Sequence, residues 1–214
     1  MSKPLVIFGV GDLPEQAYYY FSQHAGRQVE AFTVDAEFLT TDHFAGLPVL
    51  PFEETQRRFP PATHELFVAI GYSRANSVRR RVFLDAQARG YTLPSFVHET
   101  AVVARNVHIG ANCLLRELAA LSPFATLGDN VFVGVHANVS HHARIASHVF
   151  IAGGAIVCGR AILGEGCFIG ASSVVRDQAS VGPGCIVGAG AVILGDCDAG
   201  GVYVATPTPR RERS

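Results

Sequence analysis

The sequence predicts two joined architectures: an α/β N-terminal Rossmann-like domain (residues 1–96) and a left-handed parallel β-helix made of hexapeptide repeats (residues 97–198). Two observations predict them. Consecutive hexapeptides run without a break from Val97 to Asp198, and the chain before them alternates short apolar runs with helical segments. A period of six is neither the helical nor the simple strand period, and it is typical of a solenoid with one short strand on each face of a prism.

In the N-terminal domain, the apolar runs predict strands and the segments between them predict helices. The expected strands are Leu5–Phe8, Val29–Val34, Leu47–Leu50 and Glu65–Ile70, and the expected helices are Leu13–His24, Pro51–Phe59 and Arg74–Arg89. Pro14 in a first turn and Gly90 after a last turn agree with helix boundaries at those places. Alternating strands and helices predict a small parallel sheet.

Every hexapeptide has the same pattern. Its first residue is aliphatic and its fifth is small or valine, so we expect the first to fill the interior and the fifth to let the chain pass a corner. Three hexapeptides make one coil, and residues eighteen apart are therefore expected to stack. Four of the five cysteines occupy the fifth place, which predicts small buried hydrophobic residues without disulfides. Residues 199–214 are expected to form a C-terminal cap and tail.

Composition excludes some classes of function. The chain of 214 residues has 16% charged residues and a net charge of -1, which gives no general attraction to nucleic acid or to a membrane surface. No apolar stretch is long enough for a membrane span, and the N-terminus lacks a signal-peptide pattern. A cytoplasmic location is expected.

A substrate site is predicted where the strands of the parallel sheet end, because such sheets bind ligands beyond their carboxyl ends. The residues there are Gly9, Val10, Gly11, Asp35, Gly71, Tyr72 and Ser73. The glycines let a ligand approach the backbone, the following helix N-terminus favours a phosphate, and Asp35 can accept a hydrogen bond from a ribose hydroxyl. Pro14 replaces the third glycine of a GxGxxG motif, so a tight turn that needs glycine is the alternative.

Four arginines begin the helix that follows this predicted site. They are Arg74, Arg79, Arg80 and Arg81. They either meet a phosphate or solvate one face of the helix, and the second is the more common arrangement. Farther along, Phe132, Phe150 and Phe168 are eighteen apart and predict an aromatic ladder with a structural role.

Histidines mark one region of the coils. His136, His141, His142 and His148 lie close together in the sequence and predict a cluster. Gly159 is stacked against His141, and a second column of small residues consists of Gly153, Ala171 and Ala189. These columns predict a groove in which an extended ligand bonds to backbone N–H groups. The alternative is a solvated corner that needs glycine and tolerates histidine.

Two chemistries suit the histidines. A neutral imidazole is a general base near pH 7. Three histidines are also a possible zinc site, but their places do not match those of the three-histidine carbonic anhydrases with a similar solenoid, and no metal is predicted.

The whole chain resembles one family. The N-terminal FGVGD, the AIG turn at Ala69–Gly71 and the closing VYVATPTPRR resemble the sugar O-acyltransferases of the sialic-acid O-acetyltransferase type. That group includes N-acetyltransferases of nucleotide-linked amino sugars such as bacillosamine and perosamine. The resemblance implies a nucleotide-linked amino sugar in the α/β domain, a homotrimer of coils, and acetyl-CoA between subunits. It implies N-acetylation in bacterial O-antigen or other surface polysaccharide biosynthesis.

The resemblance also assigns roles. It places the general base at His141 and puts His142 where the family has a carboxylate, which is a departure that weakens support for the base. Phe150 stands where the bacillosamine-type enzymes have a histidine that contacts the thioester carbonyl. The residues expected at the acetyl-CoA are Gly153, Gly159, Ala171, Ala189 and Phe150. The alternatives are a sugar O-acetyltransferase and a non-catalytic trimeric scaffold.

Overall fold

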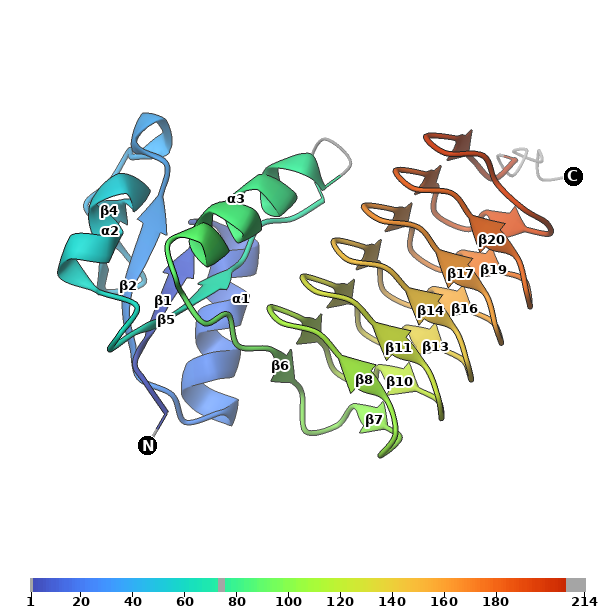
Figure 1. Ribbon diagram of the computed structural model, residues 1–214, viewed down its shortest axis with the longest axis horizontal. Helices are drawn as coiled ribbons and strands as arrows, with labels where there is room; N and C mark the ends of the chain where they lie inside the picture. Colours follow the sequence, from blue (N-terminus) through green and yellow to red (C-terminus); the bar gives the residue numbers. More distant parts are fainter. Residues whose placement is uncertain (1, 73–75, 207–214) are drawn as a thin grey trace, which may run out of the picture.

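The structure, a computed structural model, describes residues 2–72 and 76–206. Figure 1 shows an α/β part from which a column of stacked coils extends, with β20 near the far end of the column. No helix in the described ranges is long and apolar enough to cross a membrane.

The N-terminal sheet has five strands in the order β3-β4-β2-β1-β5. The strands are β1 (Leu5–Phe8), β2 (Val29–Val34), β3 (His43–Phe44), β4 (Leu47–Pro51) and β5 (Glu65–Val68). Four of them are parallel, as predicted, but β3 pairs antiparallel with β4. Strand β3 was not predicted, because two residues in a hairpin carry no periodicity. The prediction of a purely parallel sheet was therefore wrong.

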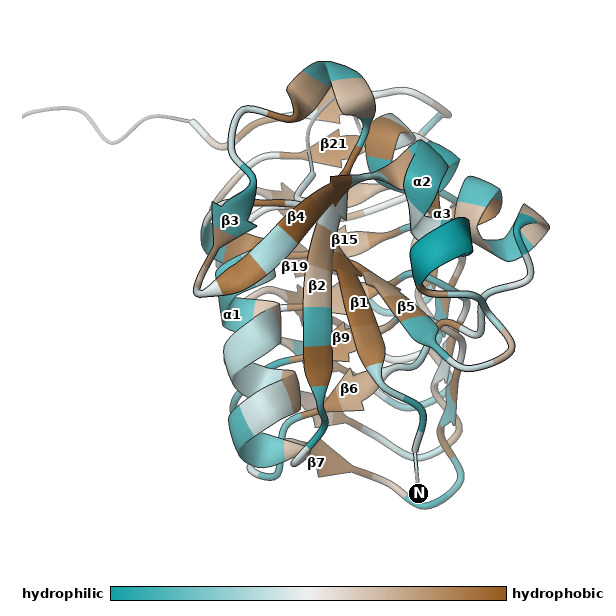
Figure 2. Cartoon of the chain, turned by 90° about the vertical axis from the view of Figure 1, so that its left-hand side faces the viewer, coloured by the Kyte–Doolittle hydropathy of each residue, from teal (hydrophilic) through white to brown (hydrophobic). Residues whose placement is uncertain are grey.

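Helices cover both faces of this sheet. They are α1 (Asp12–Tyr19), which continues as the π-helical turn η1 (Tyr20–His24), the short η2 (Ala36–Phe38), α2 (Phe52–Arg58) and α3 (Ser77–Ala88). One apolar cluster joins α1 to one face of the sheet and to the coils, and another joins α2 and α3 to the opposite face. In Figure 2 the apolar strands lie between α1 on one side and α2 and α3 on the other.

The coils form three parallel sheets, and each is named here by its number of strands. The seven-stranded sheet contains β6 (Phe96–Val97), β9 (Leu114–Leu115), β12 (Phe132–Val133), β15 (Phe150–Ile151), β18 (Phe168–Ile169), β21 (Ile186–Val187) and β23 (Val202–Tyr203). The six-stranded sheet contains β7 (Val102–Val103), β10 (Ala120–Leu121), β13 (Asn138–Val139), β16 (Ile156–Val157), β19 (Val174–Val175) and β22 (Val192–Ile193). The five-stranded sheet contains β8 (His108–Ile109), β11 (Thr126–Leu127), β14 (Arg144–Ile145), β17 (Ile162–Leu163) and β20 (Ser180–Val181).

The register confirms that residues eighteen apart stack. Asn138, for example, pairs with Ala120 on one side and with Ile156 on the other. The first and fifth places of the hexapeptides fill one continuous interior cluster from Cys113 to Cys197, as predicted. All five cysteines are free, and burial raises the pKa of the Cys113 thiol to about 11, so that this thiol behaves as a small apolar residue.

The fourth place of the hexapeptides is a corner with a left-handed backbone. His136, His142 and His148 all have positive φ there, as do Asn112 and Asn130. Histidine and asparagine adopt this conformation more readily than most residues, so these histidines have a conformational reason to be where they are. His141, at the third place, does not have a positive φ.

The seven-stranded sheet packs against the N-terminal part. Tyr20 of η1 stacks on Phe96 with ring centroids 5.2 Å apart, and Phe132 and Phe150 stack with centroids 4.1 Å apart. The predicted aromatic ladder is therefore confirmed. Its apolar surface joins the N-terminal cluster, so that the ladder holds the α/β part against the coils.

Arg79 of α3 strengthens this junction. It is 3% exposed and donates hydrogen bonds to the backbone oxygens of Asn130 (2.5 Å) and His148 (2.9 Å). Burial lowers the pKa of its guanidinium to about 10, and no ion pair to it occurs among the described residues. The neighbouring Arg80 pairs with Glu165 of the coils at 2.7 Å.

The prediction of a solvated arginine face is therefore wrong for Arg79, whereas Arg80 is exposed and its ion pair lies at the surface. The sequence could not separate Arg79 from surface arginines, because its partners are backbone oxygens of the coils. Arg74 lies outside the described residues.

Candidate active site

The coils turn at three edges, each between two of the sheets. Residues 140–142 and 158–160 join the six-stranded to the five-stranded sheet, and we call this the His141 edge. Residues 134–136 and 152–154 join the seven-stranded to the six-stranded sheet, and we call this the Gly153 edge. Residues 146–148 lie at the third edge, between the five-stranded and seven-stranded sheets.

The four histidines do not form one cluster, so that prediction was wrong. His136 lies at the Gly153 edge, His141 and His142 at the His141 edge, and His148 at the third edge. Neighbours in the sequence are separated because the chain turns a corner every six residues. Among the described residues no group of three histidine, cysteine, aspartate or glutamate side chains lies close enough to hold a metal ion.

His148 has a structural place. It is 5% exposed, its Nδ1 is 2.9 Å from Nδ2 of Asn130, and its ring packs on Phe83 of α3. Burial lowers the pKa of His148 to about 4, so its imidazole is neutral near pH 7. Since it is neutral and packed against the N-terminal part, it is not available to a substrate on the coil surface.

His141 is exposed and contacts two neighbours, His142 and Arg160. Its Nδ1 lies 3.3 Å from Nδ1 of His142, and the His142 ring stacks on Phe124 of the preceding coil with centroids 4.7 Å apart. Its backbone oxygen accepts a hydrogen bond from the N–H of Arg160 at 2.9 Å. His142 therefore occupies the place of the expected carboxylate as a stacked ring that shares one hydrogen bond with His141.

Gly159 leaves the space into which the His141 ring extends. A Cβ on Gly159 would lie 2.7 Å from both Cε1 and Nε2 of His141, and 3.0 Å from Oδ1 of Asp177. Asp177 comes from the following coil of the same column. It was not selected from the sequence, although its spacing of eighteen from Gly159 places it at the same edge. The spacing of eighteen residues, which stacks His141, Gly159 and Asp177, is the sequence signal that could have identified Asp177.

The second predicted column lies at the Gly153 edge. Ala171 and Ala189 are exposed and Gly153 is half-buried. Within residues 2–72 and 76–206, no backbone hydrogen bond is donated by the N–H of Gly153, Ala171 or Ala189. These donors and the absence of bulk suit an extended chain of amide groups. The column is separated from His141 by the width of the six-stranded sheet.

Phe150 lies apart from both edges. It is 8% exposed and packs against Phe132, Phe168 and Tyr72 on the seven-stranded sheet. Its predicted contact with a cofactor remains a prediction.

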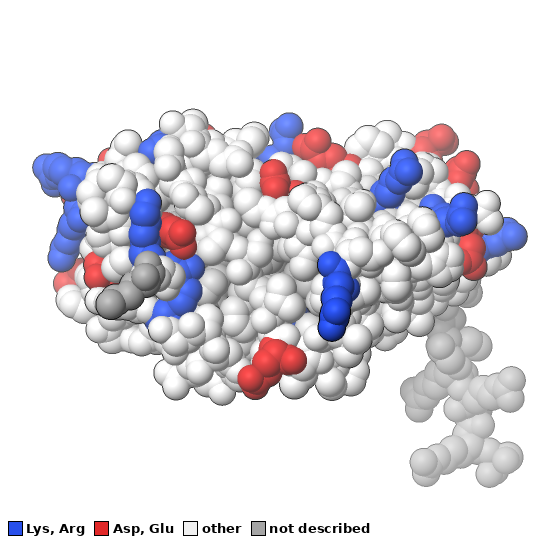
Figure 3. All heavy atoms as spheres, turned by 60° about the horizontal axis from the view of Figure 1, so that its bottom comes forward, with Lys and Arg blue, Asp and Glu red and all other residues white. Residues whose placement is uncertain are grey.

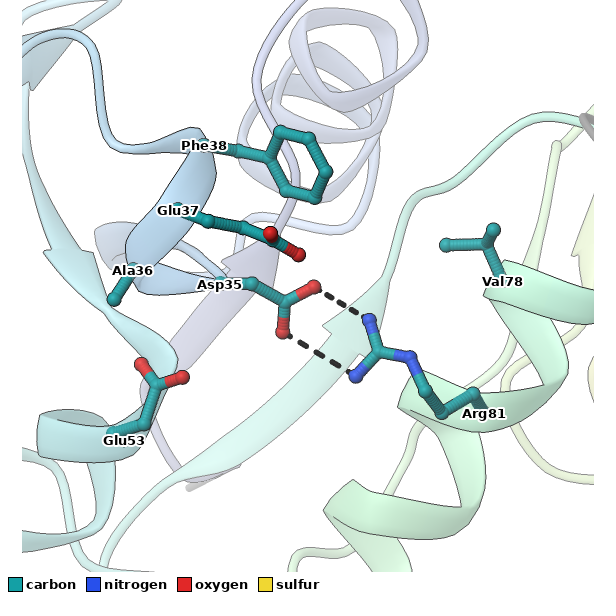
Figure 4. A pocket seen from close by; sticks show the side chains of 7 residues that line it. All are labelled: Asp35, Ala36, Glu37, Phe38, Glu53, Val78 and Arg81. Carbon is teal, nitrogen blue, oxygen red and sulfur yellow. Dashed lines mark hydrogen bonds and ion pairs between the residues drawn. The ribbon is translucent and has the colours of Figure 1, made fainter.

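The strand ends of the N-terminal sheet border a cavity of about 730 Å³. Its lining consists of Asp35, Ala36, Glu37, Phe38, Glu53, Val78 and Arg81, as Figure 4 shows. Arg81 donates two hydrogen bonds to the carboxylate of Asp35, and these hydrogen bonds raise the pKa of Arg81 above its usual range. Phe38 is 59% exposed and offers an aromatic face at the cavity.

The predicted glycines divide into two kinds. A Cβ on Gly9 would lie 2.7 Å from Pro14 and 2.9 Å from the backbone oxygen of Ala69, so close packing alone requires glycine there. At Gly11 and Gly71, no atom of the other described residues, chain neighbours aside, lies within 4 Å of the position that a Cβ would take, which leaves open space beside the backbone. Val10 packs on the apolar cluster, Tyr72 is 55% exposed, and Ser73 lies outside the described residues.

A solenoid of hexapeptides with an exposed histidine and an edge of free N–H groups has the features of the hexapeptide-repeat acyltransferases. Residues 160–195 match the family described as bacterial transferase hexapeptide (six repeats). No curated protein sequence matches the chain.

Solved structures match it over nearly its whole length. The acetyltransferase domain of PglB from Neisseria gonorrhoeae FA1090 is 28% identical, with a TM-score of 0.85 and coverage of 96% of this chain and 98% of that one. The same domain has been solved in complex with acetyl coenzyme A. A mutant of perosamine N-acetyltransferase from Caulobacter crescentus, in complex with CoA and GDP-perosamine, is 24% identical, with a TM-score of 0.85 and coverage of 98% and 97%. The resemblance to sugar acetyltransferases predicted from the sequence is confirmed.

Proposed function

We propose that this protein transfers the acetyl group of acetyl-CoA to the amine of a nucleotide-linked amino sugar. The observation that carries the proposal is the likeness to the PglB acetyltransferase domain, which extends over both parts of the chain at 28% identity. In line with this, we assign residues 1–96 to a Rossmann-like domain, residues 97–198 to a left-handed β-helix and residues 199–214 to a C-terminal cap and tail, of which residues 207–214 lie outside the described residues.

The two substrates, the nucleotide-linked amino sugar and acetyl-CoA, are expected to bind at different places on the protein. The cavity at Asp35 and Arg81 suits the nucleotide, with Phe38 as a stacking surface for the base and the open backbone at Gly11 and Gly71 for the phosphates. The Gly153 edge suits acetyl-CoA, whose amides can accept hydrogen bonds from the free N–H groups of Gly153, Ala171 and Ala189. When bound, acetyl-CoA supplies an activated acetyl group as a thioester.

His141 is the group that we expect to remove the proton of the acceptor amine. It is exposed, it carries an imidazole suited to base catalysis near pH 7, and the Gly159 column leaves room beside it. Its Nδ1 faces His142, so Nε2 is the nitrogen directed away from that contact. The other contribution to the rate of acetyl transfer is the positioning of the amine and the thioester, which react with each other when they are correctly oriented.

We further propose a homotrimer in which each active site lies between two subunits. The His141 edge and the Gly153 edge of one chain are on opposite sides of the six-stranded sheet, so one copy cannot bring its own acetyl-CoA column to its own His141. The outward residues of this sheet include Val102 (69% exposed), Ile156 and Val192 (58% exposed). An uncovered apolar face between the two edges favours packing against a second copy.

The charge distribution is compatible with that packing. The side of the molecule drawn in Figure 3 has scattered lysine, arginine and acidic side chains on a mostly uncharged surface. The outward residues of the six-stranded sheet carry no charge: Val102, Ala120, Asn138, Ile156, Val174 and Val192. By contrast, the outward positions of the five-stranded sheet include polar residues such as Thr126 and Arg144, both exposed. We propose a cytoplasmic location, in line with five free cysteines and with the substrates of the proposed reaction.

A thiol-release assay with acetyl-CoA and a panel of nucleotide-linked amino sugars tests the function. Turnover with one amino sugar is expected, and His141→Ala should lower kcat/KM by about 10²–10⁴-fold because it removes the base. His108→Ala changes an exposed histidine on the five-stranded sheet and is the control. Absence of turnover with every amino sugar, or full activity in His141→Ala, would refute the proposal.

A further inference from the structure

We propose that Asp177 places a negative charge beside the His141 ring, and that this charge stabilises the imidazolium that forms when His141 takes a proton from the acceptor amine. This inference rests on the proposed function and assigns a further residue to the same site. It addresses the departure at His142, where a second imidazole stands in place of an acidic side chain.

The geometry that carries the inference is centred on Gly159. The Nε2 atom of His141 and the Oδ1 atom of Asp177 reach toward the same point from opposite sides, one 2.7 Å and the other 3.0 Å from where a Cβ of Gly159 would be. Gly159 is buried although it has no side chain and although His141 and Asp177 are exposed. The two side chains therefore close over the glycine, and any larger residue at 159 would keep them apart.

No competing partner holds the Asp177 carboxylate. Among the described residues it takes part in no ion pair and accepts no side-chain hydrogen bond, whereas Asp196, on the next coil, accepts a hydrogen bond from the backbone N–H of Ser180 at 2.8 Å. The negative charge of Asp177 also affects another group at this edge. The pKa of Cys158 is raised, mainly by burial and secondly by the charge of Asp177. The titratable and charged groups of the edge are Arg105, His141, His142, Cys158, Arg160, Arg176, Asp177 and Asp196.

The chemistry follows from charge. An imidazole that accepts a proton becomes a cation, and a nearby carboxylate favours that cation over the neutral ring through its charge. Among the described residues no hydrogen bond or ion pair joins Asp177 to His141, so its charge acts across the space over Gly159. His142 cannot do this, because a second imidazole is neutral or positive. Asp177 therefore supplies the charge that residue 142 lacks, and it does so from two coils further along the chain.

The first experiment is an NMR titration of the histidine rings in the wild-type protein and in Asp177→Asn, which needs no substrate. The His141 signal is assigned by its loss in His141→Gln. We expect the midpoint of the His141 titration to move to lower pH by about one unit in Asp177→Asn, because an adjacent opposite charge is removed. Asp196→Asn keeps the amide oxygen that meets Ser180 and should leave the midpoint unchanged. An unchanged midpoint in Asp177→Asn would overturn the pairing.

Kinetics then test the role in catalysis. Asp177→Asn should lower kcat/KM about tenfold and move the acid limb of the pH profile to lower pH, in step with the titration. The double variant Asp177→Asn/His142→Glu should regain most of the activity, because it places a carboxylate at the usual position of the family. Wild-type kinetics in Asp177→Asn would overturn the role. A shifted titration in a protein that acetylates no amino sugar would instead refute the proposed function and leave the pairing intact.

Discussion

Replacing Gly159 by alanine tests the proposed site with a single methyl group. The new Cβ would lie 2.7 Å from Cε1 and Nε2 of His141, whereas carbon atoms in contact are about 3.5–4.0 Å apart. The imidazole must therefore move by about 1 Å. A misplacement of about 1 Å costs roughly 10²-fold in rate, so we expect kcat/KM of Gly159→Ala to fall by about that factor.

Stability should change much less than activity in this variant. His141 and Asp177 are both exposed and can swing toward solvent, and the φ of Gly159 is not in the left-handed region. We expect the free energy of unfolding to fall by less than about 1 kcal/mol, measured by urea denaturation. Gly195→Ala is the matched control, because Gly195 belongs to the same column and, chain neighbours aside, none of the described atoms lies within 4 Å of its Cβ position. Near-wild-type kcat/KM in Gly159→Ala, or equal losses in both variants, would refute the reasoning.

Three further predictions concern the junction and the cavity. Arg79→Met should lower the free energy of unfolding by roughly 3 kcal/mol in urea denaturation, because it leaves buried backbone oxygens without a donor, and a loss below about 1 kcal/mol would contradict this. The free energy of unfolding of the wild-type protein should fall by up to roughly 3 kcal/mol as the pH drops from about 6.5 to 4, because the unfolded chain protonates His148 while the folded chain keeps it neutral. The variant His148→Asn should make the free energy of unfolding depend less on pH in this range, and asparagine is compatible with the positive φ of residue 148. Asp35→Asn, which removes the charge that pairs with Arg81, should raise KM for the nucleotide-sugar about tenfold and leave KM for acetyl-CoA unchanged, and equal changes in both would argue against the cavity as the nucleotide site.

The coils were predictable residue by residue because their pattern is local. Each hexapeptide repeats the same requirement, an aliphatic residue inside and a small residue near the corner, and the register between coils follows from the spacing of eighteen. The strands β1 and β2 were also predicted with their observed bounds. β3 was missed, because a two-residue strand in a hairpin is defined by its partner and not by its own sequence.

The site was predicted less completely, since its parts come from different edges and different coils. His141 and Gly159 were selected together because stacking is visible in the spacing, and the structure places them side by side. The prediction of a histidine cluster was wrong because the coil turns a corner every six residues, which places histidines that are close in the sequence at different edges. Arg79 could not be recognised as buried, because its acceptors are backbone oxygens that no sequence pattern marks.

The uniform coil length has a consequence for how this site can vary. His141, Gly159 and Asp177 share an edge only because no insertion interrupts the hexapeptides between them. Inserting a single residue between His141 and Asp177 would shift the phase of every later residue and carry Asp177 away from the imidazole. Deleting eighteen residues would instead preserve the phase and bring the carboxylate into the neighbouring coil. The solenoid therefore tolerates changes of length here only in whole turns, and the distance between base and carboxylate can change only in steps of one strand spacing.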